Sequence, residues 1–532
     1  MAANICQDLT EVEEEIPGRA AAYSRLETAF LVVSCSADIS TCELVTSCIS
    51  LFVREVQLVD SLSELAKTPS VFRNVEIYDA IASKDFRFTG LVAFQKRLRG
   101  LLRQMPYPTA GIVTAWECIF EKWFKLSKQF ASRSSDGLEE RSFNEWRNYS
   151  GFLASLGGIC ISDQTSMPDE SSIARLKWID RLAPESYDGT LLSQYMKQSV
   201  QLLASSHVRV REATRDVLSS ELSKALHVPL FETLESELEI LFDSSRIHNA
   251  ATADSGIIFA EQAAALLKSI VDRLGSPTDI GAGFSIDIGA LTLNFAKYLN
   301  SSNDGASTLR VKIKICQLCE TLTQKKELLN LRHDVRIRNQ LLEVIFGWIA
   351  RPGSPKIDNA ILLVGTRVDE LLRLQRDLDR ACLKALADLT YRLPLQPAEG
   401  QTDADTSDLK SQMFHTYFNR FLSLLSYETA EIGRNEVRLT SAMSDESIST
   451  PELAISALSN LLSANIDVGL KHSLGIGYHE DLDVRTAFVK VLCNILIQGT
   501  EFNNLSDAAV NQKYDELLDV STIASLDLDI SC

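Results

Sequence analysis

The stretch ALSNLLSANIDVGLKHSLGIGYHEDLDVRTAFVKVLCNILIQGTEFNNL, residues 457–505, decides the fold that this sequence predicts. Its second half places apolar residues at the i, i+3, i+4, i+7 spacing of one helix face, namely Val484, Ala487, Phe488, Val491, Leu492, Ile495 and Leu496. Its first half does the same with Leu458, Leu461, Leu462, Ile466 and Leu470. We therefore predict two amphipathic helices joined by a tight turn, which is the unit of a helical repeat.

The residues at the ends of these two segments support the same interpretation. Asp481 or Asp483 can cap the second helix, because a short carboxylate accepts the free N–H groups of a first turn. Gly499 follows the last apolar residue and is expected to end the helix in a left-handed C-cap. Gly475 and Gly477 interrupt the chain between the helices; without a third glycine and a preceding strand they are not a dinucleotide-binding motif.

Composition limits the classes of function that the chain can have. Its 532 residues correspond to three or four domains of about 150 residues, or to one extended repeat array. The net charge of -18 argues against general binding to nucleic acids or anionic membranes, which requires positive charge. The acidic N-terminus has no secretory signal, and no apolar run reaches the roughly 20 residues of a membrane span. The 11 scattered cysteines lie mostly at apolar helix positions, as Cys118, Cys382 and Cys493 do, and indicate buried free thiols. Because free thiols are typical of a reducing compartment, we predict a cytoplasmic protein.

Helical periodicity continues along the chain, and no turn of the Asn-Gly type separates alternating strands. We predict an all-α fold, a HEAT/armadillo-like helical-repeat solenoid, because an isolated helix pair cannot bury its apolar face. A valine followed by a basic residue begins four of the predicted helices, at Val210, Val311, Val335 and Val484, although their spacing is irregular. The predicted helices span 22–36, 41–66, 70–83, 88–105, 109–130, 143–161, 173–183, 189–205, 207–226, 229–243, 256–274, 285–299, 308–331, 333–350, 356–392, 407–427, 451–470 and 483–498.

Composition shifts along the chain predict its division into segments. We expect an acidic arm at 1–20, N-terminal helical repeats at 21–130 and a central helical-repeat scaffold at 143–427. A flexible loop rich in Ser, Thr and Glu follows at 428–450, then a helical segment at 451–520 and a tail at 521–532.

Few residues carry recognisable chemistry. Cys316 and Cys319 form the only close cysteine pair, but zinc needs four ligands and no second pair stands at suitable spacing, so buried thiols are the favoured interpretation. His472 and His479 flank the glycine turn and are expected to stabilise it by local hydrogen bonds. We therefore assign no catalytic, cofactor-binding or metal-ligating residue and expect no cofactor.

Two charged groups have a functional and a structural interpretation. One basic cluster could contact an acidic lipid or protein, but a solvated helix face is the favoured interpretation; it comprises Lys96, Arg97, Arg99 and Arg103, interleaved with Leu98, Leu101 and Leu102. Asp377, Asp379 and Arg380 are expected to form surface ion pairs on one long helix.

Several stretches resemble one known family. Residues 465–502 are similar to the segment that precedes the catalytic domain in the neurofibromin-like Ras GTPase-activating proteins, which include the fungal inhibitory regulators of Ras. The resemblance extends over roughly 140–520 and includes NEWRN at 144–148, VREATRDVLSSELSKALHVPLFETLESELEILFDS at 210–244, KIKICQLCETL at 312–322, LDRACLKALADLTYRLPLQPAEG at 378–400 and KSQMFHTYFNRFLSLL at 410–425.

This resemblance implies a non-catalytic scaffold. Members of the family switch Ras off with an arginine finger in a Phe-Arg-Gly-Asn-Ser-like loop, and neither this loop nor the later Phe-Leu-Arg motif occurs here. The catalytic domain would begin about where this chain ends, so we expect no acceleration of GTP hydrolysis by the chain alone. The partners implied are a Ras-family small GTPase, bound through the absent catalytic domain, and a second copy in a homodimer; peripheral membrane association stays open.

Two alternatives to this interpretation stay open. One is a generic HEAT-like adaptor whose partners have nothing to do with Ras. The other, less favoured, is a metal-dependent enzyme.

Overall fold

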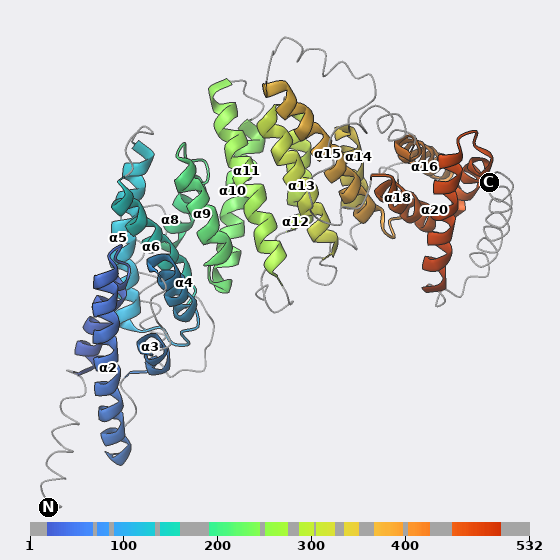
Figure 1. Cartoon of the computed structure of the whole chain (residues 1–532). Helices are drawn as coiled ribbons and strands as arrows, with labels where there is room; N and C mark the ends of the chain where they lie inside the picture. The colour runs from blue at the N-terminus through green and yellow to red at the C-terminus, as the bar shows by residue number, and fades with distance from the viewer. Residues whose placement is uncertain are drawn as a thin grey trace, which may run out of the picture. The chain divides into compact units, whose positions relative to one another are not determined.

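The computed structural model describes residues 19–66, 72–83, 90–132, 139–159, 191–244, 250–274, 287–302, 305–324, 335–349, 366–396, 403–425 and 450–501 (Figure 1). All regular secondary structure within these ranges is helical, which confirms the predicted all-α class. The chain divides into two compact units, Met1–Ile286 and Asp287–Cys532, and each is described by itself.

The first unit is built from two rows of helices. After a helical segment at 19–34, its elements are α2 (Ile39–Ala66), α3 (Val75–Ala82), α4 (Leu91–Leu102), α5 (Ala110–Ser132), α6 (Glu140–Leu156), α8 (Leu191–Leu202), α9 (Val208–Ser220), the short 3-10 helix η1 (Lys224–Leu226), α10 (His227–Ser244) and α11 (Ala250–Arg273). One row consists of α4, α6, α9 and α11, and the other of α5, α8 and α10, each helix packing on the next in its row. This two-row stacking is the arrangement of an α-solenoid.

The second unit repeats the arrangement. Its elements are α12 (Ile288–Ser301), α13 (Ala306–Gln324), α14 (Val335–Trp348), α15 (Thr366–Thr390), α16 (Asp403–Leu425), α18 (Thr450–Ala464), α19 (Ile466–Ser473), the 3-10 helix η4 (Leu474–Tyr478) and α20 (Leu482–Glu501). The helices α13, α15, α18 and α20 form one row. On the other side α12 packs on α14, and Phe346 of α14 stacks on Tyr417 of α16. The predicted HEAT/armadillo-like solenoid is therefore confirmed.

Short polar side chains set where several helices begin. The Asp38 carboxylate accepts the Thr41 backbone N–H at 2.9 Å, which caps α2, and this bond and the one from the Thr41 hydroxyl lower the pKa of Asp38. Asp287 caps α12 in the same way. At α20, Asp481 is the residue that caps, because its Oδ1 accepts the Asp483 N–H at 2.9 Å.

The centre of the first unit is aromatic. Trp116, Trp123 and Trp146 are buried, and each indole N–H has an acceptor: the Leu153 carbonyl, the Ser150 hydroxyl and the Ser127 hydroxyl, respectively. Burial of such large rings stabilises the fold most where their single polar group has a hydrogen-bond partner, as each indole N–H has here.

Four local predictions were wrong. The single helix predicted over 207–226 ends at Ser220 as α9, and the short η1 follows separately. Gly499 lies inside α20, which continues to Glu501, so it is not a C-cap. The single helix predicted over 451–470 is divided at Asn465 into α18 and α19. The break predicted at 244–255 ends early, because α11 begins at Ala250.

The predicted segment limits stay predictions. The helix predicted at 173–183 lies outside the described residues, as do the tail at 521–532 and almost all of the arm at 1–20 and the loop at 428–450.

Candidate functional site

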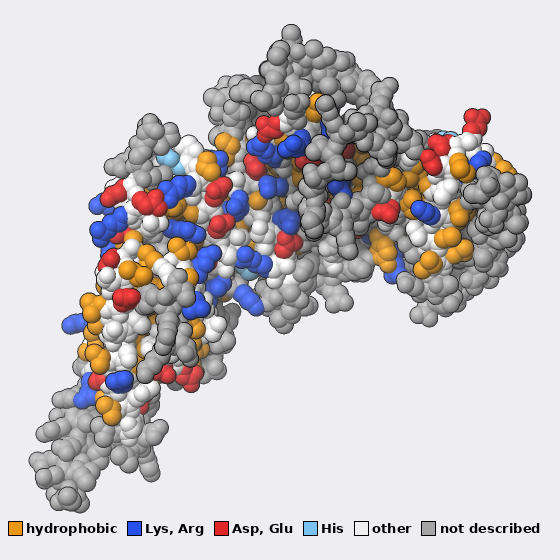
Figure 2. Space-filling model, in the orientation of Figure 1, with side chains coloured by type: hydrophobic (Ala, Val, Ile, Leu, Met, Phe, Trp, Pro, Cys, Tyr) orange, Lys and Arg blue, Asp and Glu red, His pale blue; other side chains and the backbone are white. Residues whose placement is uncertain are grey.

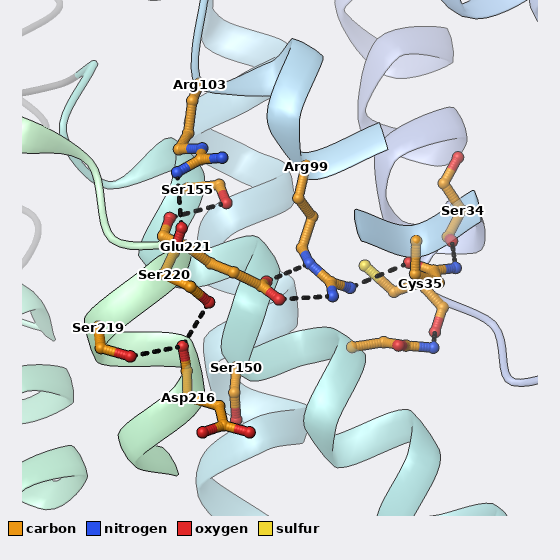
Figure 3. Close-up of polar contacts among 12 residues, drawn as sticks. Ser34, Cys35, Arg99, Arg103, Ser150, Ser155, Asp216, Ser219, Ser220 and Glu221 are labelled. Atoms are coloured by element: carbon orange, nitrogen blue, oxygen red, sulfur yellow. Dashed lines mark hydrogen bonds and ion pairs between the residues drawn. The ribbon is translucent and has the colours of Figure 1, made fainter. Parts of the chain in front are cut away.

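A buried ion pair links two helices of the first unit (Figure 3). Arg99 comes from α4, and Glu221 directly follows the last residue of α9. The Arg99 Nη2 atom donates to Glu221 Oε1 at 3.0 Å, and Nε pairs with Oε2 of the same carboxylate. The two side chains are only 4% and 9% exposed. A two-point contact of this kind fixes orientation as well as distance, so it sets how α4 lies against α9.

The ion pair continues into a network that reaches the first helical segment. Arg99 Nη1 donates to Gln95 Oε1 at 3.4 Å, and Gln95 Nε2 donates to the Ser34 carbonyl at 2.6 Å. From α6, Asn148 Nδ2 donates to the Cys35 carbonyl at 3.2 Å. The carbonyls at the end of the 19–34 helix are thus satisfied by side chains of α4 and α6, as buried backbone groups require.

Further side chains gather at the C-terminal end of α9. Arg103 Nη1 donates to the Ser220 carbonyl at 2.9 Å, and Arg273 of α11 donates to the Ser219 carbonyl. Ser155 of α6 donates to the Glu221 carbonyl at 3.2 Å. The last carbonyls of a helix carry partial negative charge, so guanidinium groups stabilise them. Helices α4, α6 and α11 are all fastened to this one helix end.

Glycine at position 151 makes this arrangement sterically feasible. A Cβ atom placed on Gly151 of α6 would overlap both the Arg99 side chain and the Glu221 carboxylate. The ion pair therefore lies directly against the α6 backbone, and any larger residue would displace it.

A second buried acid lies in the first unit. Glu27 accepts from the Tyr78 hydroxyl at 2.9 Å and from the Thr109 hydroxyl. Burial raises the pKa of Glu27 to about 7, against the two hydrogen bonds, which lower it. The group joins the 19–34 helix to α3 and to the residue before α5.

The contacts of these clusters join neighbouring helices, which is a structural role. Within the described residues, no group of three or more His, Cys, Asp or Glu side chains is placed to hold a metal. The interior gap between Trp123, Trp146 and Tyr195 leaves no room for a water molecule. The polar groups of the ion-pair network bind one another and backbone carbonyls.

The basic cluster was interpreted incorrectly at Arg99. Lys96 and Arg97 on α4 and Arg103 directly after it are exposed, as expected, but Arg99 is buried in its ion pair. The partner of Arg99 stands 122 residues away, so the spacing of charges within α4 could not reveal it. On the face seen in Figure 2, basic and acidic side chains are interspersed over the first unit.

The cysteines are mostly as predicted. Cys316 and Cys319 of α13 are buried, and Cys316 Sγ lies 3.7 Å from Sγ of the buried Cys382 in α15. Burial raises the pKa of Cys316 and Cys319 well above the usual range, which makes them poor nucleophiles and poor metal ligands. Cys118 is half-buried, and the expectation that Cys493 is buried was wrong: it lies on the exposed side of α20.

The glycine turn is held by local hydrogen bonds, as predicted for His479. Its Nδ1 accepts the Asp481 N–H at 3.1 Å, and its carbonyl accepts from Arg485 at 3.2 Å. Gly475 and Gly477 lie within η4. The His472 side chain lies outside the described residues.

The ion pairs predicted for the long charged helix stay a prediction. Asp379 accepts a hydrogen bond from Gln375 at 3.0 Å, and Asp377 and Arg380 are exposed on α15.

Sequence reasoning missed Glu221 and Glu27. Glu221 gave no signal, since it falls inside the helix predicted over 207–226, whereas α9 ends at Ser220. Glu27 did: with Tyr23 and Leu31 it occupies the i, i+4, i+8 positions of a buried face, where an acid needs a partner.

Comparison with curated proteins finds distant relatives. Over 456 residues the chain is 24% identical to the inhibitory regulator protein IRA2 of Saccharomyces cerevisiae, covering 84% of this chain and 14% of IRA2. It is also 24% identical over 482 residues to IRA1 of the same yeast, covering 86% of this chain and 15% of IRA1. The chain thus spans about a seventh of the length of these relatives. No family model matches it.

Solved structures give weaker matches. An engineered protein has 14% identity and a TM-score of 0.19, covering 84% of this chain and 98% of its own. A chain from a study of the interaction between cadherin and β-catenin has 12% identity and a TM-score of 0.21, and the match covers 93% of this chain and 99% of that one. Scores this low carry no argument.

In the described part of the chain, no single helix is long and apolar enough to cross a membrane. Pro451–Ala464 and Ile466–Tyr478 reach the length and apolar composition of a membrane span only when the two are taken together. The chain bends by 110° between them.

Proposed function

We propose that this chain is a non-catalytic helical scaffold region of a neurofibromin-like Ras GTPase-activating protein. The observation that carries the proposal is the similarity to IRA1 and IRA2, which extends over 84–86% of the chain. A match of this extent at 24% identity is what a shared solenoid region produces, since the buried face of each repeat constrains residues along its whole length.

The polar networks support a scaffold role. Arg99 and Arg103 fasten α4 to the end of α9, Arg273 fastens α11 to it and Ser155 fastens α6, so these contacts specify how neighbouring helices lie. A solenoid whose neighbouring helices are fastened in this way can hold a catalytic domain in position for Ras. The acceleration itself requires an arginine that stabilises the transferring phosphoryl group, and the members of this family supply that arginine from a separate catalytic domain.

Single-turnover GTP hydrolysis by Ras tests the proposal. The chain alone is expected to leave the rate unchanged. A yeast IRA2 whose matching 456-residue segment is replaced by this chain is expected to retain Ras inactivation, whereas IRA2 without the segment is expected to lose it. A folded, expressed replacement that behaves like the deletion refutes the scaffold role, and acceleration by the chain alone refutes the non-catalytic assignment.

A generic HEAT-like adaptor is the second candidate, since the stacked helices of the described residues suit an adaptor as well as they suit a scaffold. It predicts that the replacement fails and that affinity capture with the chain finds partners outside the Ras pathway.

A further inference from the structure

The 19–34 helix and α2 share an exposed apolar face. On α2, Leu44, Leu51 and Leu58 are 66%, 66% and 68% exposed. On the 19–34 helix, Leu26 and Val33 are 42% and 40% exposed. In Figure 2 apolar side chains are visible along the edge of the first unit where α2 lies. Single exposed apolar residues are ordinary, but five on two paired helices are not.

Contacts between the two helices place these residues side by side. The Tyr23 hydroxyl donates to Glu55 Oε1 at 2.9 Å, and the Phe30 and Phe52 ring centroids lie 5.5 Å apart. Residue numbers rise on one helix as they fall on the other, so the pair is antiparallel. On a helical wheel the exposed leucines of α2 lie within about 60° of Glu55, and the exposed residues of the 19–34 helix within about 60° of Phe30. Both rows therefore border the contact and form one face.

The sequence just before this helix pair carries a complementary pattern. Four apolar residues stand at intervals of four, three and four, namely Ile5, Leu9, Val12 and Ile16. This is the spacing of a helix that packs along one apolar line. The other positions of residues 5–16 include five acids and no basic residue, and a Pro-Gly pair, which favours a turn, follows at 17–18.

We propose that residues 5–16 form an amphipathic helix that docks on this apolar face as a third helix beside the 19–34 helix and α2. A reversal at 17–18 makes the segment antiparallel to the 19–34 helix and therefore parallel to α2. Ile16 then lies beside Leu58 and Leu9 beside Leu51, because each pair on its own helix is seven residues apart. A helix of this length is about 18 Å long and covers the about 10 Å between the two leucines.

Charge favours this occupant. Arg25 and Arg54 are both exposed, and the helical wheel places them on the two outer edges of the apolar face. An acidic helix between them has a positive side chain on each flank. Of the acids on the same side of α2, Glu55 accepts from Tyr23, and Glu43 lies at the end of the face farthest from residue 19.

The tether favours it as well. Only two residues join the segment to the 19–34 helix, which corresponds to a millimolar effective concentration, so a weak contact is sufficient. The docking involves only residues 5–58 and is independent of the Ras proposal.

Hydrogen exchange of the full chain is the first experiment. Amides of residues 5–16 are expected to exchange at least about 10-fold more slowly than in an isolated peptide of residues 1–18, because docking holds their helical hydrogen bonds. Exchange at the peptide rate overturns the proposal. Protection that is lost on dilution from about 50 to about 1 µM identifies a second copy as the occupant and also overturns it.

Substitution of the face identifies the surface. In L51D/L58D the amides of residues 5–16 are expected to exchange at the peptide rate, because carboxylates replace the docking leucines. V92D is the matched control: Val92 is 58% exposed on α4, outside the face, and its replacement is expected to leave the protection unchanged. All variants are compared for thermal unfolding. Protection that persists in a folded L51D/L58D variant overturns the proposal.

Thiol modification tests the docking from the other side. The docked segment is expected to make L51C react with N-ethylmaleimide about 10-fold more slowly than V92C, as followed by mass spectrometry of the peptides, since the two sites are otherwise similarly exposed. Adding L9D/V12D to L51C is expected to raise its rate to that of V92C. Equal rates in the two single variants overturn the proposal, as does an L51C that stays slow when L9D/V12D is added.

Discussion

Removal of one partner from the Arg99–Glu221 pair is expected to destabilise the first unit strongly. In the R99M variant, a carboxylate that is 9% exposed loses both of its contacts with the guanidinium. An uncompensated buried charge of this kind costs about 3–5 kcal/mol, whereas the new methionine recovers a part through its apolar contacts. We therefore expect the free energy of unfolding to fall by about 3 kcal/mol. K96M, on the exposed side of the same helix, is expected to stay within about 0.5 kcal/mol of the original chain.

The double variant R99M/E221M makes the test specific. Replacement of both partners by apolar side chains is often neutral, so the double variant is expected to recover most of the loss. Because the chain has two units that need not unfold together, the assay is hydrogen exchange of α4 and α9 peptides across a urea series. If R99M lowers the free energy of unfolding no more than K96M does, the buried pair does not fasten these helices and the reasoning is wrong. The same holds if the losses caused by R99M and by E221M alone simply add in the double variant.

Three further predictions concern other buried contacts. Because the pKa of Glu27 is raised to about 7, this residue destabilises the fold progressively as pH rises from about 4.5 to about 7. E27Q should therefore raise the free energy of unfolding, measured in urea, by up to about 3 kcal/mol at pH 8 and by almost nothing at pH 4. In G469A the new methyl group would lie 2.6 Å from the Phe414 ring, so thermal unfolding should show a loss of about 1–3 kcal/mol, and an unchanged melting temperature would contradict the packing. N465A removes the acceptor of the Leu395 N–H, bonded at 2.8 Å, and should cost about 2–3 kcal/mol with faster amide exchange at Leu395; unaltered exchange there would show that the bond is dispensable.

Periodicity in the sequence was sufficient to predict which faces of the helices are buried. Val484, Phe488 and Val491 were assigned to a core face from spacing alone, and all three are buried in α20. The reason is physical: a helix repeats every 3.6 residues, so a core on one side leaves its pattern in a contiguous stretch. The cap at Asp481 was recognisable for the same reason, since capping is a contact between near neighbours.

Contacts between distant residues left no comparable pattern. Arg99 stands in an exposed-looking run of basic residues, and only the fold shows that Glu221 neutralises it. Gly499 looked like a helix end, but local preference for a C-cap is worth less than continued packing of α20. Cys493 follows the buried Leu492 in the sequence, but its side chain lies on the solvent side of α20, so it is exposed and not buried as predicted. Each error concerns a position where tertiary structure overrides a local preference.

The buried polar side chains fix how neighbouring helices of this irregular solenoid align along their length, which its apolar faces alone do not do. Leucine and valine ridges tolerate sliding, because one apolar neighbour replaces another at little cost. Arg338 of α14 instead donates to the carbonyls of Leu389 and Tyr391 at the end of α15, and Asn465 donates to the Leu393 carbonyl at 3.0 Å. A shift of one helix by a single turn would leave these buried groups unpaired, which is expensive. We infer that polar contacts to helix ends, rather than a regular sequence repeat, fix the register of neighbouring helices, which is why the repeats can vary in length and spacing and still stack.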